Sequence, residues 1–190
     1  MGKMTEVRFH GRGGQGAKTA ADLLASTALE TGKHIQSFPE YGPERAGAPI
    51  KSFTRISDGE ITLHCGVTNP DIVVVIDASL LESQNVTDGL GDDGILLVNT
   101  PGKPDSIRKI TGFNKGRVFT VNATQISLDT LGLPLPNTPM LGALLKATEL
   151  VSLENLKKSV EKKFLKKIGE KKVRGNLESI ERAYKEATEG

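Results

Sequence analysis

The chain has 190 residues, enough for one compact domain with a sizeable core, and its 25 lysine and arginine residues nearly balance its 23 aspartate and glutamate residues. The resulting net charge of +2 does not demand a nucleic-acid partner, and the single cysteine, Cys65, excludes an internal disulfide or an iron–sulfur cluster held by this chain alone. The start, MGKMTEVRF, lacks the apolar segment of a signal peptide and no run is long enough to cross a bilayer, so we expect a cytoplasmic protein without a membrane partner.

The first predicted elements are a strand and a helix separated by glycines. Residues 6–10 continue as a strand into HGRGGQG, and from Ala17 onward apolar residues recur at helical spacing. Gly32 supplies a left-handed stop for that helix. Residues 34–38 then predict a second strand, and a loop rich in proline and glycine follows over 39–49.

An antiparallel hairpin is predicted next. Residues 50–56 and 61–64 flank Ser57-Asp58-Gly59-Glu60, in which the Asp-Gly pair offers the positive φ that a tight hairpin turn needs. We therefore expect one β-hairpin inserted in the fold.

Three later strands carry the signature of a parallel sheet. DIVVVID at 71–77 is a β-branched run typical of a strand buried on both faces, and 95–99 and 118–122 repeat it. Helices are expected after each strand, most clearly over 123–131 and 138–150. The sequence thus predicts an α/β protein with a Rossmann-like, doubly wound, mostly parallel sheet.

The C-terminal part has a different composition. From 152 onward an apolar stripe is surrounded by lysines, which predicts one amphipathic helix and then a last helix capped by Asn176. We expect a single domain, 1–190, with an α/β core over 1–151 and a helical, lysine-rich extension over 152–190. The lysines are either a solvated helix face or a basic surface for an acidic partner or nucleic acid; no aromatic residues interleave with them, which weakens the nucleic-acid alternative.

The glycine turn is the strongest motif. Gly11, Gly13 and Gly16 fit G-x-G-x-x-G between a strand and a helix, which predicts a tight turn at Gly11, a close backbone approach at Gly13 and close helix packing at Gly16. A helix N-terminus attracts anions, and Arg12 and Lys18 add full charges. The alternative is a turn that packs only against its own sheet or a neighbouring subunit.

A self-contained enzyme is not indicated. An NAD site would use an acidic residue at the end of the second strand, and Glu40 is near that place but opens a long loop. His10, His34 and His64 are scattered, and we interpret all three as structural. An NAD-binding oxidoreductase domain and, from GRGG and the lysines, an RNA-binding module remain as alternatives.

Three stretches together carry a resemblance. GRGGQG at 11–16, FPEYGPERAGAP at 38–49 and NTPMLGA at 137–143 resemble the gamma subunit of 2-oxoacid:ferredoxin oxidoreductases, most closely that of pyruvate:ferredoxin oxidoreductase, also called pyruvate synthase. The resemblance covers most of the chain, in the right order.

The resemblance implies a division of labour within a multi-subunit enzyme. Thiamine diphosphate, magnesium and the iron–sulfur clusters would lie on alpha, beta and delta subunits, and ferredoxin would accept the electrons. This chain would pack against those subunits and take part in coenzyme A binding, holding no cofactor or metal alone and carrying no catalytic residue. The enzyme would convert pyruvate and coenzyme A to acetyl-CoA and carbon dioxide.

The resemblance also selects candidate ligand-binding residues. Arg45 would grip a phosphate or carboxylate through two hydrogen bonds, unless it only pairs with Glu44. Asn137 would either cap the following helix, which its preference favours, or contact the ligand. The full set of candidates is Gly11, Arg12, Gly13, Gly14, Gln15, Gly16, Tyr41, Glu44, Arg45 and Asn137.

Overall fold

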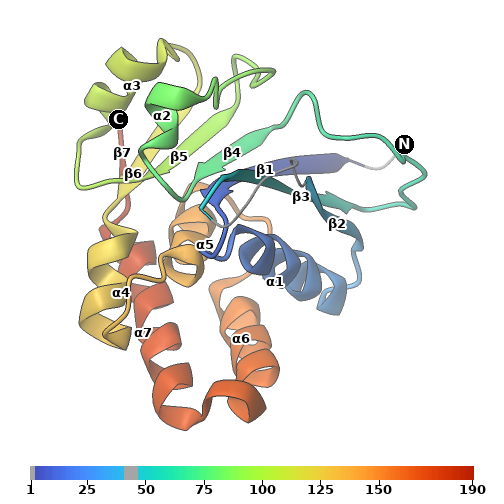
Figure 1. The fold of residues 1–190 in the computed structure, drawn as a ribbon. Helices are drawn as coiled ribbons and strands as arrows, with labels where there is room; N and C mark the ends of the chain where they lie inside the picture. The colour runs from blue at the N-terminus through green and yellow to red at the C-terminus, as the bar shows by residue number, and fades with distance from the viewer. Residues whose placement is uncertain (1–2, 41–46) are drawn as a thin grey trace.

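The computed structural model describes residues 3–40 and 47–190. One seven-stranded sheet with helices on both faces makes up the fold (Figure 1). Its strands are β1 (Met4–Arg12), β2 (His34–Glu40), β3 (Pro49–Ser57), β4 (Ile72–Val75), β5 (Ile95–Asn99), β6 (Arg117–Val121) and β7 (Thr188–Glu189). The helices are α1 (Ala17–Glu30), α2 (Leu80–Ser83), α3 (Pro104–Thr111), α4 (Ala123–Leu131), α5 (Asn137–Ala147), α6 (Leu153–Ile168) and α7 (Glu170–Glu186).

The sheet is mostly parallel, as predicted. Its strand order is β2-β3-β1-β4-β5-β6-β7, and β1, β4, β5 and β6 pair in parallel. β3 pairs antiparallel with both β1 and β2, and β7 pairs antiparallel with β6. The continuous apolar runs at 71–77, 95–99 and 118–122 therefore form the middle of the sheet, where both faces of a strand are covered.

Two hydrophobic cores lie on the two faces of the sheet. On one face, Phe9, Val74 and Leu97 pack with buried residues of α1, α4, α5, α6 and α7. On the other face, Val73 and Val98 pack with residues of α2 and α3. Figure 1 shows the same division, with α2 and α3 on one side and the larger group of helices on the other. The doubly wound expectation is confirmed.

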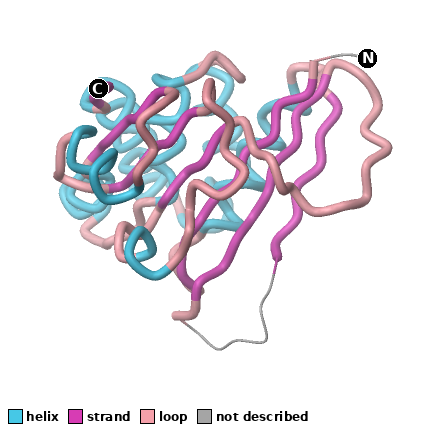
Figure 2. Tube along the Cα trace, turned by 90° about the horizontal axis from the view of Figure 1, so that it is seen from above, coloured by secondary structure: helices cyan, strands magenta, loops and turns pink. Residues whose placement is uncertain are grey.

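The predicted hairpin paired the wrong segments of the chain. Residues 50–56 belong to β3, but 61–64 form no strand, and β3 pairs instead with β2 and β1. The reason is that β1 and β2 occupy both edges of β3, so no edge is free for 61–64. The antiparallel hairpin is β2–β3, and the loop between β3 and β4 runs along that side of the sheet (Figure 2).

The C-terminal helices pack on the larger core. Leu156 of α6 and Ile180 and Ala183 of α7 are fully buried there. The predicted cap at Asn176 is wrong: α7 begins at Glu170, after Gly169 with φ of 78°, and the Asn176 side chain donates to the Lys172 carbonyl inside the helix. β7, which pairs with β6 after α7, was not predicted.

Candidate functional site

The site lies where the chain changes direction across the sheet. After β1 the chain builds β2 and β3 on one side of β1, and it then returns to place β4 on the other side. In open α/β sheets such a switch point leaves a crevice at the carboxyl ends of the two flanking strands. The glycine turn follows β1 at this edge, and residues 76–79 follow β4.

The glycine turn has two residues in a left-handed conformation. Gly14 has φ of 95° and Gly16 has φ of 80°, a region in which side chains cost energy. Gly11 belongs to β1, and a Cβ there would lie 3.2 Å from the Cβ of Ala17. The predicted roles of Gly11 and Gly16 are therefore wrong and are exchanged: Gly11 permits close packing of strand and helix, and Gly16 makes the turn.

The turn leaves backbone donors at the start of α1. Arg12 N–H donates to Gln15 Oε1 (2.8 Å) and Gln15 N–H donates to the Arg12 carbonyl (3.1 Å), which closes the turn. The amides of Gly14, Gly16 and Ala17 have no acceptor among the described residues. Such amides, with the helix dipole behind them, form a site that can bind an anion.

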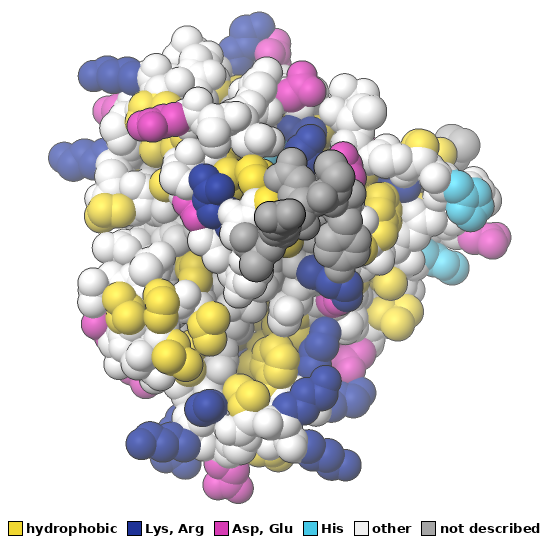
Figure 3. Space-filling model, in the orientation of Figure 1, with side chains coloured by type: hydrophobic (Ala, Val, Ile, Leu, Met, Phe, Trp, Pro, Cys, Tyr) yellow, Lys and Arg dark blue, Asp and Glu magenta, His cyan; other side chains and the backbone are white. Residues whose placement is uncertain are grey.

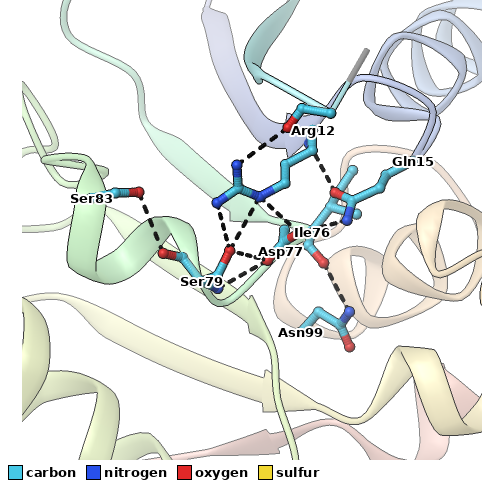
Figure 4. Close-up of polar contacts among 8 residues, drawn as sticks. Arg12, Gln15, Ile76, Asp77, Ser79, Ser83 and Asn99 are labelled. Atoms are coloured by element: carbon cyan, nitrogen blue, oxygen red, sulfur yellow. Dashed lines mark hydrogen bonds and ion pairs between the residues drawn. The ribbon is translucent and has the colours of Figure 1, made fainter.

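Arg12 joins the chain segments on the two sides of the switch point. Its Nε and Nη2 donate to Ser79 Oγ (3.2 and 2.9 Å), and its Nε lies 3.3 Å from Asp77 Oδ2. Its Nη1 donates to the carbonyl of Gly47, just before β3 (3.2 Å). Figure 4 shows Arg12 and Gln15 reaching across to Asp77 and Ser79. The charge of Arg12 is thus largely compensated by a carboxylate within the site.

Asp77 is the acceptor at the centre of this network. It accepts from Gln15 Nε2 (2.6 Å) and from the hydroxyl of Ser79 (2.7 Å). Burial would raise the pKa of Asp77, but hydrogen bonds from Ser79 and Gln15 and the charge of Arg12 outweigh it and lower the pKa below its usual value. Asn99 of β5 supports the segment by donating to the Ile76 carbonyl (2.8 Å).

Sequence reasoning missed Asp77 and Ser79. A signal was present, because Asp77 is the first polar residue after the buried run of β4, and polar residues that end a parallel strand lie at the edge where ligands bind. The glycine motif is local to residues 11–16, and the strand order that brings β4 beside β1 is not encoded there.

Asn137 lies against the glycine turn. A Cβ on Gly16 would come within 2.7 Å of Asn137 Nδ2, so the two residues are in close contact. The predicted helix cap is wrong, because the N-cap position is Pro136 and the Asn137 side chain caps no amide. Its amide group makes no hydrogen bond within the described part of the chain, which leaves it available at the edge of the turn.

His10 is buried in β1 beside the turn and is neutral. Burial is the first cause that lowers its pKa, to about 3, and the charges of Arg8 and Lys51 add to it. A neutral group with so low a pKa does not exchange protons at neutral pH. His34 and His64 are exposed and lie elsewhere.

The geometry does not match an NAD site. Glu40 ends β2, but β3 lies between β2 and β1, so Glu40 is two strands away from the glycine turn. An acidic residue that binds the ribose needs the second strand directly beside the first. The NAD-binding alternative therefore lacks the acidic residue that it requires on the strand beside the glycine turn.

The loop of the second motif is described only in part. Tyr41, Glu44 and Arg45 lie outside the described residues. The end of the loop contacts the glycine turn, because Gly13 N–H donates to the Ala48 carbonyl (3.0 Å). This end of the loop and the glycine turn therefore lie at the same edge of the sheet.

The described residues form neither a metal site nor a membrane-spanning helix. No group of three or more His, Cys, Asp or Glu side chains gathers there in a way that could hold a metal ion. No helix over 3–40 and 47–190 is both long and apolar enough to span a membrane.

Sequence comparison finds a family and full-length relatives. The model of the family described as pyruvate ferredoxin/flavodoxin oxidoreductase matches residues 6–186. The pyruvate synthase subunit PorC of Thermotoga maritima is 50% identical over 184 residues, covering 97% of this chain and 95% of the relative. The common subunit gamma of the pyruvate/ketoisovalerate oxidoreductases of Thermococcus kodakarensis is 46% identical over 181 residues, covering 95% of this chain and 96% of the relative.

Solved structures share the fold. The crystal structure of the Thermotoga maritima pyruvate oxidoreductase subunit PORC has a TM-score of 0.89 at 46% identity and covers 99% of both chains. A 2-oxoglutarate:ferredoxin oxidoreductase of Magnetococcus marinus has a TM-score of 0.78 at 22% identity, over 95% of this chain and 30% of that chain. The second likeness concerns the fold alone.

Proposed function

The chain belongs to the pyruvate ferredoxin/flavodoxin oxidoreductase family, and we propose that its part in the reaction is to hold the phosphates of coenzyme A at the glycine turn. It is a gamma-type subunit of a pyruvate synthase, an oxidoreductase complex. Coenzyme A carries a diphosphate and a 3′-phosphate, which need N–H donors wherever they bind. The free amides of Gly14, Gly16 and Ala17 at the start of α1 are the observation that carries the proposal.

Arg12 acts at this site mainly by cancelling the charge of Asp77. The two groups lie 3.3 Å apart, and Arg12 reaches from the Gly47 carbonyl to the Ser79 hydroxyl. Without the guanidinium, the ionised carboxylate would face an incoming phosphate with no compensation. The network therefore keeps the crevice acceptable to an anion while the amides supply the attraction.

The chemistry belongs to other subunits in this proposal. Cys65 is the only cysteine of the chain, so iron–sulfur clusters must be held by partners. Thiamine diphosphate and magnesium would lie on the alpha and beta subunits, and the clusters on the beta and delta subunits. This chain binds and orients coenzyme A, and the thioester forms where the partners hold the acyl group.

The choice of 2-oxoacid also lies outside this chain. The Thermococcus kodakarensis relative is named as a subunit common to pyruvate and ketoisovalerate oxidoreductases. A subunit that serves two such enzymes contributes what their reactions share, and we propose the same for this chain. Substitutions in the glycine turn should then leave the dependence on pyruvate unchanged.

An exposed apolar surface supports a packing role at the same edge. Leu128 of α4 and Leu133 and Leu135 of the next loop are exposed, and Figure 3 shows hydrophobic side chains gathered over the α4 side of the molecule. That loop leads directly into Asn137, which touches Gly16. Apolar patches of this kind mark stable protein interfaces. We propose that a subunit of the complex covers it.

The coenzyme A test uses two arginine variants of the assembled complex. Arg12 and Arg182 are comparable, because their side chains are 32% and 34% exposed and each pairs with an aspartate, at 3.3 and 3.1 Å. Arg182 additionally pairs with Glu186 (3.0 Å). Arg12→Ala should raise the KM for coenzyme A roughly ten- to a hundredfold, because the ionised carboxylate of Asp77 would then repel the phosphate without compensation. Arg182→Ala on α7 should leave that KM unchanged.

The measurement is steady-state kinetics with coenzyme A and pyruvate varied separately on complexes shown to be intact. The KM for pyruvate should stay the same in both variants. If Arg12→Ala assembles fully and keeps the parent's dependence on coenzyme A, the glycine turn is only structural.

The packing test asks which chains co-purify. Leu133→Asp with Leu135→Asp should reduce recovery of the partner subunits while the isolated chain stays folded, because both side chains are exposed. Ile110→Asp, on an exposed position of α3 at the other face, is the control and should not affect recovery. Full recovery with the double variant would refute the packing proposal.

A further inference from the structure

Positive charge is concentrated at the outer end of the α6–α7 pair. Residues 157–174 hold nine of the 25 lysine and arginine residues but only two of the 23 acidic ones. The rest of the chain accordingly has more acidic than basic residues. Figure 3 shows Lys and Arg side chains gathered at the lower end of the molecule, where α6 meets α7 in Figure 1.

Much of this charge has no internal partner. Three lysines nearer the sheet are paired, namely Lys157 with Glu181, Lys158 with Glu154 and Lys162 with Glu30. Beyond them lies a group that is exposed and forms no ion pair within the described ranges: Lys166, Lys167, Lys171, Lys172 and Arg174, here termed the basic end. Burial, and the nearby charges of Lys167 and Lys18, lower the pKa of Lys163 despite the opposing charge of Asp22.

A groove between α6 and α7 lies beside the basic end. It is lined by the apolar residues Leu165, Val173 and Leu177 and by the charged residues Glu161, Glu170 and Arg174, and its volume is about 330 Å³. Leu165 is 40% exposed there. The groove is small and half of its lining residues are charged, whereas the cores of permanent interfaces are depleted in charge. This surface therefore suits a transient partner better than a permanent subunit.

The residues favour an acidic protein over a nucleic acid. The aromatic residue of this segment, Phe164, packs against the core and cannot stack on a base. A protein with surface carboxylates and one protruding apolar side chain can form ion pairs with the lysines and an apolar contact with Leu165.

We propose that the basic end docks the acidic electron-carrier protein that this enzyme reduces. The inference rests on the proposed function, because a subunit of a ferredoxin/flavodoxin oxidoreductase works beside such a carrier. The charges steer the carrier towards the complex and the groove receives an apolar side chain of it. Because this chain holds no cluster, it supports one flank of the carrier while a cluster-bearing subunit faces the redox centre.

The test compares two triple variants of the intact complex, using ferredoxin as the probe. The test variant replaces three lysines of the basic end by glutamine: Lys167, Lys171 and Lys172. The control variant replaces three exposed lysines around α3 by glutamine: Lys103, Lys109 and Lys115. Both lose three positive charges, so an effect of net charge alone would be equal in the two variants.

The proposal predicts a change confined to the carrier. At low ionic strength the test variant should raise the KM for ferredoxin about tenfold and flatten the salt dependence of kcat/KM, and the control should do neither. Reduction of a small dye and the KM values for pyruvate and coenzyme A should stay unchanged. Leu165→Ala should raise the KM for ferredoxin severalfold without changing its salt dependence, whereas Ile110→Ala should not.

Three results would overturn the proposal. An unchanged KM for ferredoxin in the test variant would do so directly. Loss of partner subunits from the test variant would make the basic end a subunit interface. Salt-sensitive binding of RNA that the test variant alone loses, with unchanged ferredoxin kinetics, would assign the surface to nucleic acid. The coenzyme A readout of Arg12→Ala is separate, so failure here leaves the proposed function standing.

Discussion

Replacing His10 by leucine should remove a defined part of the chain's sensitivity to mild acid. His10 is 2% exposed, its Nε2 has no partner among residues 3–40 and 47–190, and burial followed by the charges of Arg8 and Lys51 lowers its pKa to about 3. An unfolded histidine titrates near pH 6.5. Below that pH the unfolded chain binds a proton that the folded chain does not, so stability falls as the pH drops from 6.5 towards 3.

The size of the effect follows from the two pKa values. Between pH 7 and pH 5 the folded state keeps His10 neutral while nearly all unfolded chains become protonated there. The free energy of unfolding should fall by about 2 kcal/mol over this interval from His10 alone. In His10→Leu this contribution is absent, and its stability at pH 7 should lie within about 1.5 kcal/mol of the parent because the volumes are similar.

Urea unfolding of the isolated chain at pH 7 and pH 5 measures the difference. The parent should lose about 2 kcal/mol more than His10→Leu between the two pH values. Exposed His34 and His64 are present in both proteins and cancel. Asp22 and Asp77, with pKa values below their usual value, contribute mainly below this interval. Equal losses in the two proteins would mean that His10 titrates normally, and the reasoning from its burial would be refuted.

Three further outcomes follow from packing, charge and composition. Gly142→Ala should lower the free energy of unfolding by about 2–3 kcal/mol, because its Cβ would lie 2.2 Å from the Ile180 carbonyl oxygen. Gly59→Ala is the control, since no atom lies within 4 Å of the new Cβ, and it should be neutral or slightly stabilising in the same urea experiment. Glu6→Gln should cost about 3 kcal/mol, since it leaves the 1%-exposed Arg55 without its carboxylate; a cost below about 1 kcal/mol would contradict this. The purified chain should be colourless and should not reduce a dye with pyruvate; iron–sulfur absorption bands would refute that.

Continuous apolar strands were predictable from the sequence, and their partners at the edge of the sheet were not. β4, β5 and β6 are recognisable in the sequence as continuous apolar runs, because both faces of each strand are buried. The hairpin prediction failed because the Asp58-Gly59 pair favours a tight turn locally, while β3 gains pairs along its whole length with β1 and β2. Pairing over long sequence separations outweighs the preference of one turn.

The candidate site was predictable only where it is local. The glycine turn between a strand and a helix N-terminus was predictable, but the positive φ values occur at Gly14 and Gly16 and not at Gly11, where the tight turn was predicted. The contacts of Asp77 with Arg12 and of Asn137 with Gly16 bring together residues far apart in the chain. They depend on strand order and on how α5 packs beside α1, which no periodicity in the sequence encodes.

The sheet combines a firmly held half with a loosely held one. β4, β5 and β6 lie between two cores, whereas β2 is an edge strand and the α2 side of the hairpin is covered by the loop over 58–71, held by contacts such as Arg55 with the Gly66 carbonyl and Gln36 with the Leu63 carbonyl. Local fluctuations that expose amides to hydrogen exchange should therefore cost less free energy in β2 than in β5. Arg12 joins the two halves, because it donates to the Gly47 carbonyl before β3 and to the Ser79 hydroxyl after β4. A fluctuation that separates the two halves at this edge would have to break these hydrogen bonds.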